Sequence, residues 1–510
     1  MGTQIATIVM SFICRTVFIS TLGKTYLGVT SLFTNILSML SLADLGIGTA
    51  ITYYMYEPLS QNDQHRVVIL MDFYKKAYML IAGVIAVIGV GLIPFLPVLI
   101  KDYDTMETLG LNGVLIYLLF LSKSVSTYLF FAHRSVIIRA DQHQYIIEFV
   151  ETCAIIAQDI LQIVSLVLWG DFITYVLIQI ACVVIKNIIT ASIAKKQYPY
   201  INQKPDEKIA KSEIKNIFKD CGSVFVYRIN RVILKSTDNI VLSASLGLSA
   251  VAQYSNYYVF YTVISGFYTK INVALIHSIG NLHVNNDLEH EHKIFKALFL
   301  AMIIVGGTAG VGIAVCSDEL ISTWLGESWI IEQPFSIMMG IELFFLCLQY
   351  FLSKYRNAVG LFQQMKFFPI LGSVTNIAAS LILVKLMGIS GVILGTIIAE
   401  AIVFMVIDPR IIYKYGFKSN FKLTSFYANL TLQTGVLVVA FFICRFLCGY
   451  FIGYGWFSVI AHVIICGVVT PGLIVLVNIR KKETQYLLNV MLGRMVKKIR
   501  HKILPQSVIK

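Results

Sequence analysis

Charged residues are scarce in this sequence. Asp, Glu, Lys and Arg make up 14% of its 510 residues, whereas hydrophobic residues make up 57%. Soluble domains carry about 25% charged residues, so a large soluble domain is excluded. The sequence therefore predicts an all-α, polytopic membrane protein, and we expect no nucleic-acid partner.

The signatures of catalytic and metal sites are also missing. The nine cysteines are scattered, mostly within apolar runs, and no CxxC pair occurs, which is typical of small core residues. No Walker motif, nucleophile elbow, HExxH motif or nucleotide-binding fingerprint is present. His283, His290 and His292 share a loop with acidic residues, but their spacing is unspecific for a metal. We expect neither an enzyme nor a bound cofactor or metal.

What the sequence has instead is a series of apolar segments, each long enough to cross a bilayer. We count about fourteen, near residues 3–22, 27–56, 77–100, 111–132, 145–169, 172–194, 219–244, 250–276, 294–316, 334–354, 367–386, 390–408, 425–447 and 455–478. Short turns that contain Gly23, Gly170, Gly247 and Gly388 predict tight helical hairpins. The glycine-rich stretch 306–310 predicts helix packing rather than a phosphate-binding loop.

Lysines and arginines concentrate in alternate connections and in the C-terminal tail. The remaining connections hold Lys24, Lys101 and Lys385. By the positive-inside rule, both termini are expected in the cytoplasm. The tail after residue 480 predicts an amphipathic surface helix on anionic lipid, with a protein-docking tail as the alternative.

The longest basic connection divides the chain. We expect an N-terminal six-helix lobe (1–194), a basic cytoplasmic linker (195–218), a C-terminal six-helix lobe (219–408), an additional helix pair (425–478) and a basic cytoplasmic tail (479–510). Residues 21–31 align without gaps with residues 245–255, and each stretch is the hairpin that opens its half. Such internal repeats are the usual architecture of secondary transporters.

One apolar segment, residues 226–239, carries four charges on one face. Arg228, Arg231, Lys235 and Asp238 are spaced by three, four and three residues, which places them within an arc of about 80° on a helix. Each charge at mid-bilayer costs roughly 2.5–3.5 kcal/mol. This face must therefore look at a water-filled cavity or at partner charges.

Two further charges lie inside expected spans near the N-terminus. Arg15 is roughly 18 Å into the first segment at ~1.5 Å per residue, too deep for easy escape to the surface. A role in a functional cavity and a structural ion pair are both open for it. Asp44, close to Gly46 and Gly48, either pairs with an arginine or lies near the cytoplasmic end of its helix.

The fifth segment has an acidic face. Glu148, Glu151 and Asp159 project with Gln158 and Gln162 into an arc of about 100° on a helix. These carboxylates are either static salt-bridge partners of the basic helices or groups that couple transport to protons or cations.

Six short stretches run in order over most of the chain. They are residues 42–50 with 56–59, 140–145, 236–240 with 254–257, 278–281, 355–362 and 388–396. Together they resemble the bacterial polysaccharide repeat-unit flippases, the Wzx-type branch of the multidrug/oligosaccharidyl-lipid/polysaccharide exporter superfamily. The stretch after residue 362 departs from that pattern. Residues 363–365, Gln-Gln-Met, lack the acidic residue expected there, which weakens the case for an ionic role at that helix end.

The resemblance implies a two-lobed helical fold like the multidrug and lipid II exporters, in the bacterial inner membrane. It implies that undecaprenyl-diphosphate-linked oligosaccharide is moved from the inner to the outer leaflet by alternating access. The implied partners are this glycan lipid, membrane lipids and, as a further option, the polysaccharide polymerase machinery.

A pyrophosphate that crosses a bilayer needs a cationic cavity, and arginine binds phosphate oxygens bidentately. We therefore expect Arg15, Arg228 and Arg231 to bind it, with Lys235 as a further electrostatic contact. Five carboxylates inside the expected spans are candidates for H⁺ or Na⁺ coupling or for counter-charges: Asp44, Glu148, Glu151, Asp159 and Asp238.

Two alternatives compete with a flippase. A cation-coupled multidrug exporter of the same fold should favour an acidic or aromatic cavity, and the basic face of residues 226–239 argues against it. A membrane-embedded glycan polymerase or ligase needs a large outside loop with catalytic groups. The longest outside loop, near residues 317–333, is short and lacks them.

Overall fold

The structure is a computed structural model that consists of helices and their connections in the part of the chain it describes. The described residues are 2–41, 47–101, 103, 112–207, 209–210, 212–214, 236–284, 287–361, 363–365, 368–453 and 455–487. The chain divides into two compact units, Met1–Ala252 and Gln253–Lys510. The finer lobe boundaries expected from the sequence stay a prediction.

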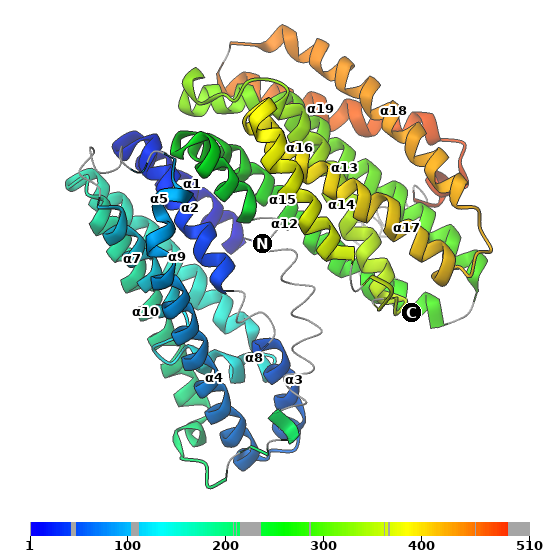
Figure 1. Cartoon of the computed structure of the whole chain (residues 1–510). Helices are drawn as coiled ribbons and strands as arrows, with labels where there is room; N and C mark the ends of the chain where they lie inside the picture. The colour runs from blue at the N-terminus through cyan, green and yellow to red at the C-terminus, as the bar shows by residue number, and fades with distance from the viewer. Residues whose placement is uncertain are drawn as a thin grey trace, which may run out of the picture. The chain divides into compact units, whose positions relative to one another are not determined.

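The first unit is built from antiparallel helices joined by short turns (Figure 1). Its α-helices are α1 (Gly2–Leu22), α2 (Lys24–Leu40), α3 (Ile47–Ser60), α4 (Gln64–Gly91), α5 (Leu96–Leu99), α7 (Gly113–Ser126), α8 (Ser135–Ala140), α9 (Gln144–Leu168) and α10 (Phe172–Gln197). A further helical run covers residues 236–246.

The second unit contains the longest helices of the described chain. They are α12 (Leu248–Val284), which contains the boundary between the units, α13 (Leu288–Leu325), α14 (Phe335–Ala358), α15 (Phe368–Met387), α16 (Ile389–Glu400), α17 (Asp408–Ile411), α18 (Leu423–Cys448) and α19 (Trp456–Asn478). Two π-helical stretches, Ala401–Ile407 and Ile412–Gly416, flank α17.

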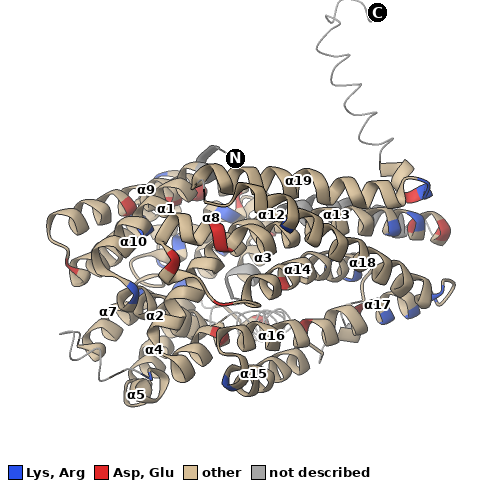
Figure 2. Cartoon of the chain, turned by 90° about the horizontal axis from the view of Figure 1, so that it is seen from above, with Lys and Arg blue, Asp and Glu red and all other residues tan. Residues whose placement is uncertain are grey.

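The structure confirms the prediction of an all-α polytopic membrane protein. Nine helices in the described part of the chain are long and apolar enough to cross a membrane. Charged side chains are sparse along them, as the predominance of tan ribbon in Figure 2 shows. One expected segment, 111–132, is longer than the helix that the structure contains. The corresponding helix α7 ends at Ser126, and Phe130 and Phe131 after it adopt positive φ. The expected segment 27–56 is described as two helices, α2 and α3, on either side of 42–46, which lie outside the described residues.

The four predicted glycine hairpins are confirmed. Gly23, Gly170, Gly247 and Gly388 have φ values of 86°, 61°, 93° and 59°, in the left-handed region that favours glycine. The aligned glycines, Gly23 and Gly247, also make the same kind of hydrogen bond. The N–H of each donates to the carbonyl four residues earlier, at 3.0 and 3.1 Å. The two hairpins therefore match in conformation, as the internal repeat requires.

The glycine-rich stretch 306–310 lies at a helix contact in the second unit. A Cβ atom on Gly310 would collide with the carbonyl oxygen of Gly340 on α14, and a Cβ on Gly306 would meet the side chain of Cys347. The backbones of α13 and α14 thus approach closely, as small residues one turn apart allow in membrane helices. The prediction of helix packing is confirmed.

We expect Gly310→Leu to lower the thermal stability of the protein, because the larger side chain must push α13 and α14 apart. Overpacking costs about 1–3 kcal/mol. The matched control is Gly312→Leu, since a Cβ on Gly312 meets nothing within 4 Å. Fluorescence-detected size-exclusion chromatography after heating would measure both variants. Equal melting temperatures would contradict the close contact.

A buried ion pair joins two distant segments of the second unit. Arg356, in the last turn of α14, donates from Nη1 to Oδ1 of Asp408 at the start of α17. The side chains are 1% and 0% exposed. The sequence argued against an ionic role near this helix end, because residues 363–365 are not acidic. That interpretation was wrong, since the carboxylate comes from a segment fifty-two positions away.

Asp408→Ala should destabilise the protein by about 3–5 kcal/mol, because it leaves the Arg356 charge buried without its counter-charge. The double variant Arg356→Met with Asp408→Leu should recover most of the loss. Asp72→Ala is the control, because the side chains of the Lys76–Asp72 pair, at 2.6 Å, are 63% and 28% exposed, and solvent-accessible pairs contribute about 0–1 kcal/mol. Thermal unfolding in detergent measures all three. If Asp408→Ala behaves like Asp72→Ala, the pair has no structural role.

Candidate functional site

Part of the predicted cationic site lies outside the described residues. This applies to Arg228, Arg231 and Lys235, and equally to Asp44. The described helical run 236–246 continues the same segment. Its Asp238 is 4% exposed, so this carboxylate is buried near the end of the segment. Its role as a counter-charge stays a prediction.

The run 236–246 is fixed to the rest of the first unit at both ends. Ser236 Oγ lies 3.0 Å from Ser38 Oγ on α2. Farther along, the N–H of Lys101 donates to the carbonyl of Ser243 at 3.2 Å. The described run that follows the cationic residues therefore packs against α2, in the same unit as Arg15.

Arg15 lies in a polar cluster between α1, α9 and α10. One turn earlier on α1, the Ser11 hydroxyl donates to Oδ2 of Asp159 on α9 at 2.7 Å. Tyr175 on α10 is within electrostatic reach of both Arg15 and Asp159. Asp159 is 5% exposed. Arg15 and Asp159, which the sequence predicted separately, thus both lie within electrostatic reach of Tyr175.

The polar cluster extends along α10 to a further cation. Gln162 Nε2 donates to the Tyr175 carbonyl at 3.1 Å, and the side chains of Tyr175 and Gln179 are hydrogen-bonded. Lys123 Nζ on α7 donates to Gln179 Oε1 at 2.6 Å. The sequence analysis missed Tyr175, Gln179 and Lys123. The signal was present for Lys123, which is a charge inside an apolar segment.

The other carboxylates of the acidic face are more accessible than Asp159. Glu151 is 3.5 Å from Lys186 Nζ on α10, and both side chains are partly exposed. Glu148 is exposed and accepts a hydrogen bond from Gln144 Nε2 at 3.4 Å. The static ion-pair interpretation therefore suits Glu151, and its partner lies on α10. Of the three predicted carboxylates on α9, only Asp159 is buried among polar groups.

The second unit holds a pair of buried carboxylates that the sequence analysis did not single out. Glu342 on α14 and Glu400 on α16 are 5% and 6% exposed, and Tyr261 on α12 is 1% exposed. Tyr261 is hydrogen-bonded to Glu342 and within electrostatic reach of Glu400. Both glutamates lie in apolar segments, so the rule that flags intramembrane charges would have found them.

The clustered side chains are charged groups, amides and hydroxyl groups. Within the described residues, no group of three or more His, Cys, Asp or Glu side chains could hold a metal ion. The expected histidine loop is wrong, because His292 lies on α13; its ring stacks on that of Phe421 with the ring centroids 3.8 Å apart. The arrangement around Arg15 offers one cation, one carboxylate and several hydrogen-bond donors inside an otherwise apolar helix bundle.

The first 283 residues match the family model described as "Polysaccharide biosynthesis protein". This match covers more than half of the 510 residues. No curated protein matches the sequence.

Several solved membrane transporters have a similar fold. A structure of the lipid II flippase MurJ in an inward closed conformation matches with a TM-score of 0.66 and 14% identity, over 93% of this chain and 98% of that one. An inward-facing multidrug resistance MATE family transporter of the MOP superfamily matches with a TM-score of 0.62 and 13% identity, over 81% and 96%. The eukaryotic MATE transporter AtDTX14 matches with a TM-score of 0.51 and 14% identity, over 82% and 95%. At these identities the likeness concerns the fold.

Proposed function

Because this chain belongs to the polysaccharide biosynthesis protein family, we propose that it is a flippase for undecaprenyl-diphosphate-linked oligosaccharide. It moves the repeat unit from the cytoplasmic to the outer leaflet of the bacterial inner membrane, with both termini in the cytoplasm. The glycan lipid and the surrounding membrane lipids are its partners, and the polysaccharide polymerase machinery is the proposed recipient of the product.

Two features carry this proposal, the polar cluster around Arg15 and the cationic sequence that precedes the helical run 236–246. Arg15 lies deep in α1 within a polar cluster, and the segment with Arg228, Arg231 and Lys235 runs into the helix that packs on α2 through Ser236. A charged side chain in the hydrocarbon core of a membrane costs free energy. A function that requires such charges gives a reason for their presence. A pyrophosphate headgroup provides the matching anion.

The fold supports the proposal in a second way. A solved protein of similar fold is named a lipid II flippase, and lipid flipping forms and breaks no covalent bond. Binding and release of the pyrophosphate require only cations whose charge is offset, and Asp238 and Asp159 are buried carboxylates in the same unit. No enzymatic step is part of the proposed function.

Arg231→Ala should abolish polymer export, because it removes a cation on which the pyrophosphate depends. The assay is complementation of a flippase-null strain, scored for outer-leaflet glycan, with membrane insertion checked by immunoblot. Arg231→Lys should recover export only in part, because an ammonium group cannot bind phosphate bidentately. Arg480→Ala, at an exposed position, is the matched control and should export normally. Wild-type export by Arg231→Ala would refute the cationic site.

We further propose that Asp159 couples transport to a cation gradient. Asp159→Asn should make glycan-lipid flipping in proteoliposomes insensitive to an imposed proton or sodium gradient, because the amide takes up no proton at neutral pH and attracts Na⁺ without a negative charge. Glu148→Gln, at the exposed end of the same helix, should keep the gradient response. If Asp159→Asn keeps the wild-type response, Asp159 is a structural partner of Ser11.

The alternative is a cation-coupled multidrug exporter. Tyr261 with Glu342 and Glu400 forms the kind of acidic and aromatic cluster that suits a cationic drug. Efflux of a cationic dye by the same proteoliposomes distinguishes the two functions. Dye efflux without glycan-lipid flipping would favour the exporter.

A further inference from the structure

An open pocket lies at one end of the first unit, away from the cluster around Arg15. Its volume is about 870 Å³, and it is formed where the end of α3 meets the turn between α8 and α9. The lining residues with polar or aromatic side chains are Tyr56, Glu57, Ser60, Asp141, Gln142, His143 and Tyr145. Under the proposed orientation, both loops face the cytoplasm.

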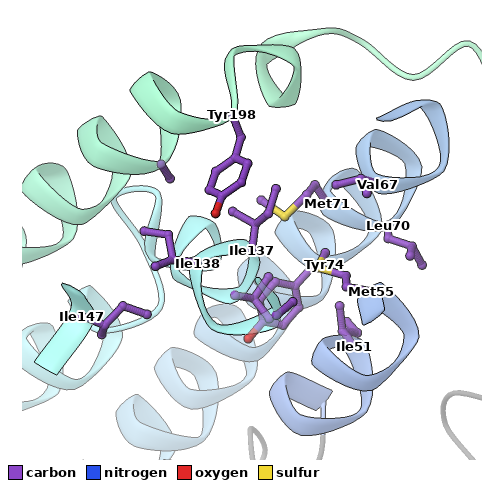
Figure 3. Close-up of a cluster of buried hydrophobic side chains, with 13 residues drawn as sticks. Ile51, Met55, Val67, Leu70, Met71, Tyr74, Ile137, Ile138, Ile147 and Tyr198 are labelled. Atoms are coloured by element: carbon purple, nitrogen blue, oxygen red, sulfur yellow. The ribbon is translucent and has the colours of Figure 1, made fainter. Parts of the chain in front are cut away.

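The helices that carry this pocket share a close-packed hydrophobic core. Ile51 and Met55 of α3 pack with Ile137 and Ile138 of α8, and all four are 0% exposed. Figure 3 shows these side chains converging with others from α4, α9 and the end of α10. A close-packed base of this kind holds the turns above it in one conformation.

The turn between α8 and α9 is fixed as well. Gln142 has a φ of 61°, and the N–H of His143 donates to the Ile138 carbonyl at 3.0 Å. Asp141 Oδ2 accepts a hydrogen bond from the Tyr198 hydroxyl at 2.6 Å and lies 3.2 Å from His143 Nδ1. Burial and this hydrogen bond raise the pKa of Tyr198 above its usual range, so its proton stays on the phenol. The carboxylate is thus held in place before any ligand binds.

The side chains around the opening combine aromatic faces with hydrogen-bond acceptors. Tyr56 and Tyr145 come from different helices and are 48% and 66% exposed. Glu57, Ser60 and Gln142 are exposed beside them. Tyrosines offer flat apolar surfaces with a polar edge, and a few convergent polar groups on an apolar wall are typical of ligand sites.

The charge of the pocket restricts the ligand. The described residues that line it include two carboxylates, Glu57 and Asp141, and no lysine or arginine. Like charges repel, so a phosphate or a uronic acid fits poorly. A neutral sugar fits well, because its hydroxyl groups donate to carboxylate oxygens and its C–H faces pack on aromatic rings.

We propose that this pocket binds a neutral sugar of the lipid-linked glycan, with the ring against Tyr145 and Tyr56 and its hydroxyl groups donating to Asp141 and Glu57. The inference rests on the proposed function and deepens it. It assigns recognition of the sugar to a surface distinct from the cations that would bind the pyrophosphate. A lysine-rich segment of a partner protein is the competing ligand for a pocket of this charge.

The test uses the full chain in detergent and three probes. They are the lipid-linked oligosaccharide extracted from a flippase-null host, the free oligosaccharide released from it by mild acid, and undecaprenyl diphosphate without sugar. Tyr145→Ala should weaken binding of the first two probes by about ten-fold and leave undecaprenyl diphosphate unaffected. Glu57→Gln should act in the same direction. Phe149→Ala is the control, since this ring lies one turn along α9, is 64% exposed and is not part of the pocket.

Three outcomes would overturn the sugar site. They are no binding of the free oligosaccharide by the wild type, equal loss of all probes in Tyr145→Ala, or binding of a lysine-rich peptide that Glu57→Gln weakens and the oligosaccharide does not displace. Failure of the proposed function is seen separately, as absence of flipping in proteoliposomes. A pocket that binds the free oligosaccharide in a protein that does not flip would keep the sugar site and reject the flippase.

Discussion

A polar side chain in hydrocarbon must find its partner inside the protein, and this constraint governs where the chain places its charges and amides. Gln433 on α18 and Asn478 on α19 illustrate it, because both are 0% exposed and each amide donates to the other, at 2.8 and 3.0 Å. Arg356 and Asp408 solve the same problem with charges. Such pairs specify which helices become neighbours. Apolar surfaces specify this less well, because lipid tails are as apolar as the side chains of another helix.

The constraint also separates structural charges from functional ones. Arg356 has a single buried carboxylate against it, so its charge is largely offset within the second unit. Arg15 lies instead within electrostatic reach of Tyr175, in a cluster where Asp159 accepts a hydrogen bond from Ser11. The proposed function assigns an external anion to Arg15 as its ligand.

Much of the fold could be predicted from the sequence, because its physical causes are local. Apolar length fixes the membrane helices, and the positive φ of Gly23 and Gly247 follows from turns too tight for other residues. The early end of α7 at Ser126 was not predictable from apolar content, since Phe130 and Phe131 continue the hydrophobic run yet lie in a turn. Hydropathy indicates whether a residue prefers lipid or water, and it says little about the conformation of the backbone.

The candidate site was less predictable, because pairing depends on which helices become neighbours. Periodicity placed Glu148, Glu151 and Asp159 on one face, but only tertiary packing separates the buried Asp159 from the other two. The partner of Lys123 is an uncharged amide on α10, Gln179, and no charge pattern could identify it. A rule that searches for opposite charges misses pairs of this kind.

The chemistry of a glycan lipid gives a reason for two separate recognition surfaces. Its pyrophosphate is anionic and its neutral sugars are rich in hydroxyl donors, so one surface of uniform charge cannot suit both. In the first unit, Glu57 and Asp141 line a pocket with exposed tyrosines, while Arg15 lies within the helix bundle beside Tyr175. A protein that holds the sugar by hydrogen bonds and stacking needs fewer cations for its affinity. Under the proposed function, weaker binding of the anion favours its release on the far side of the membrane, because affinity differences lie mostly in the dissociation rate.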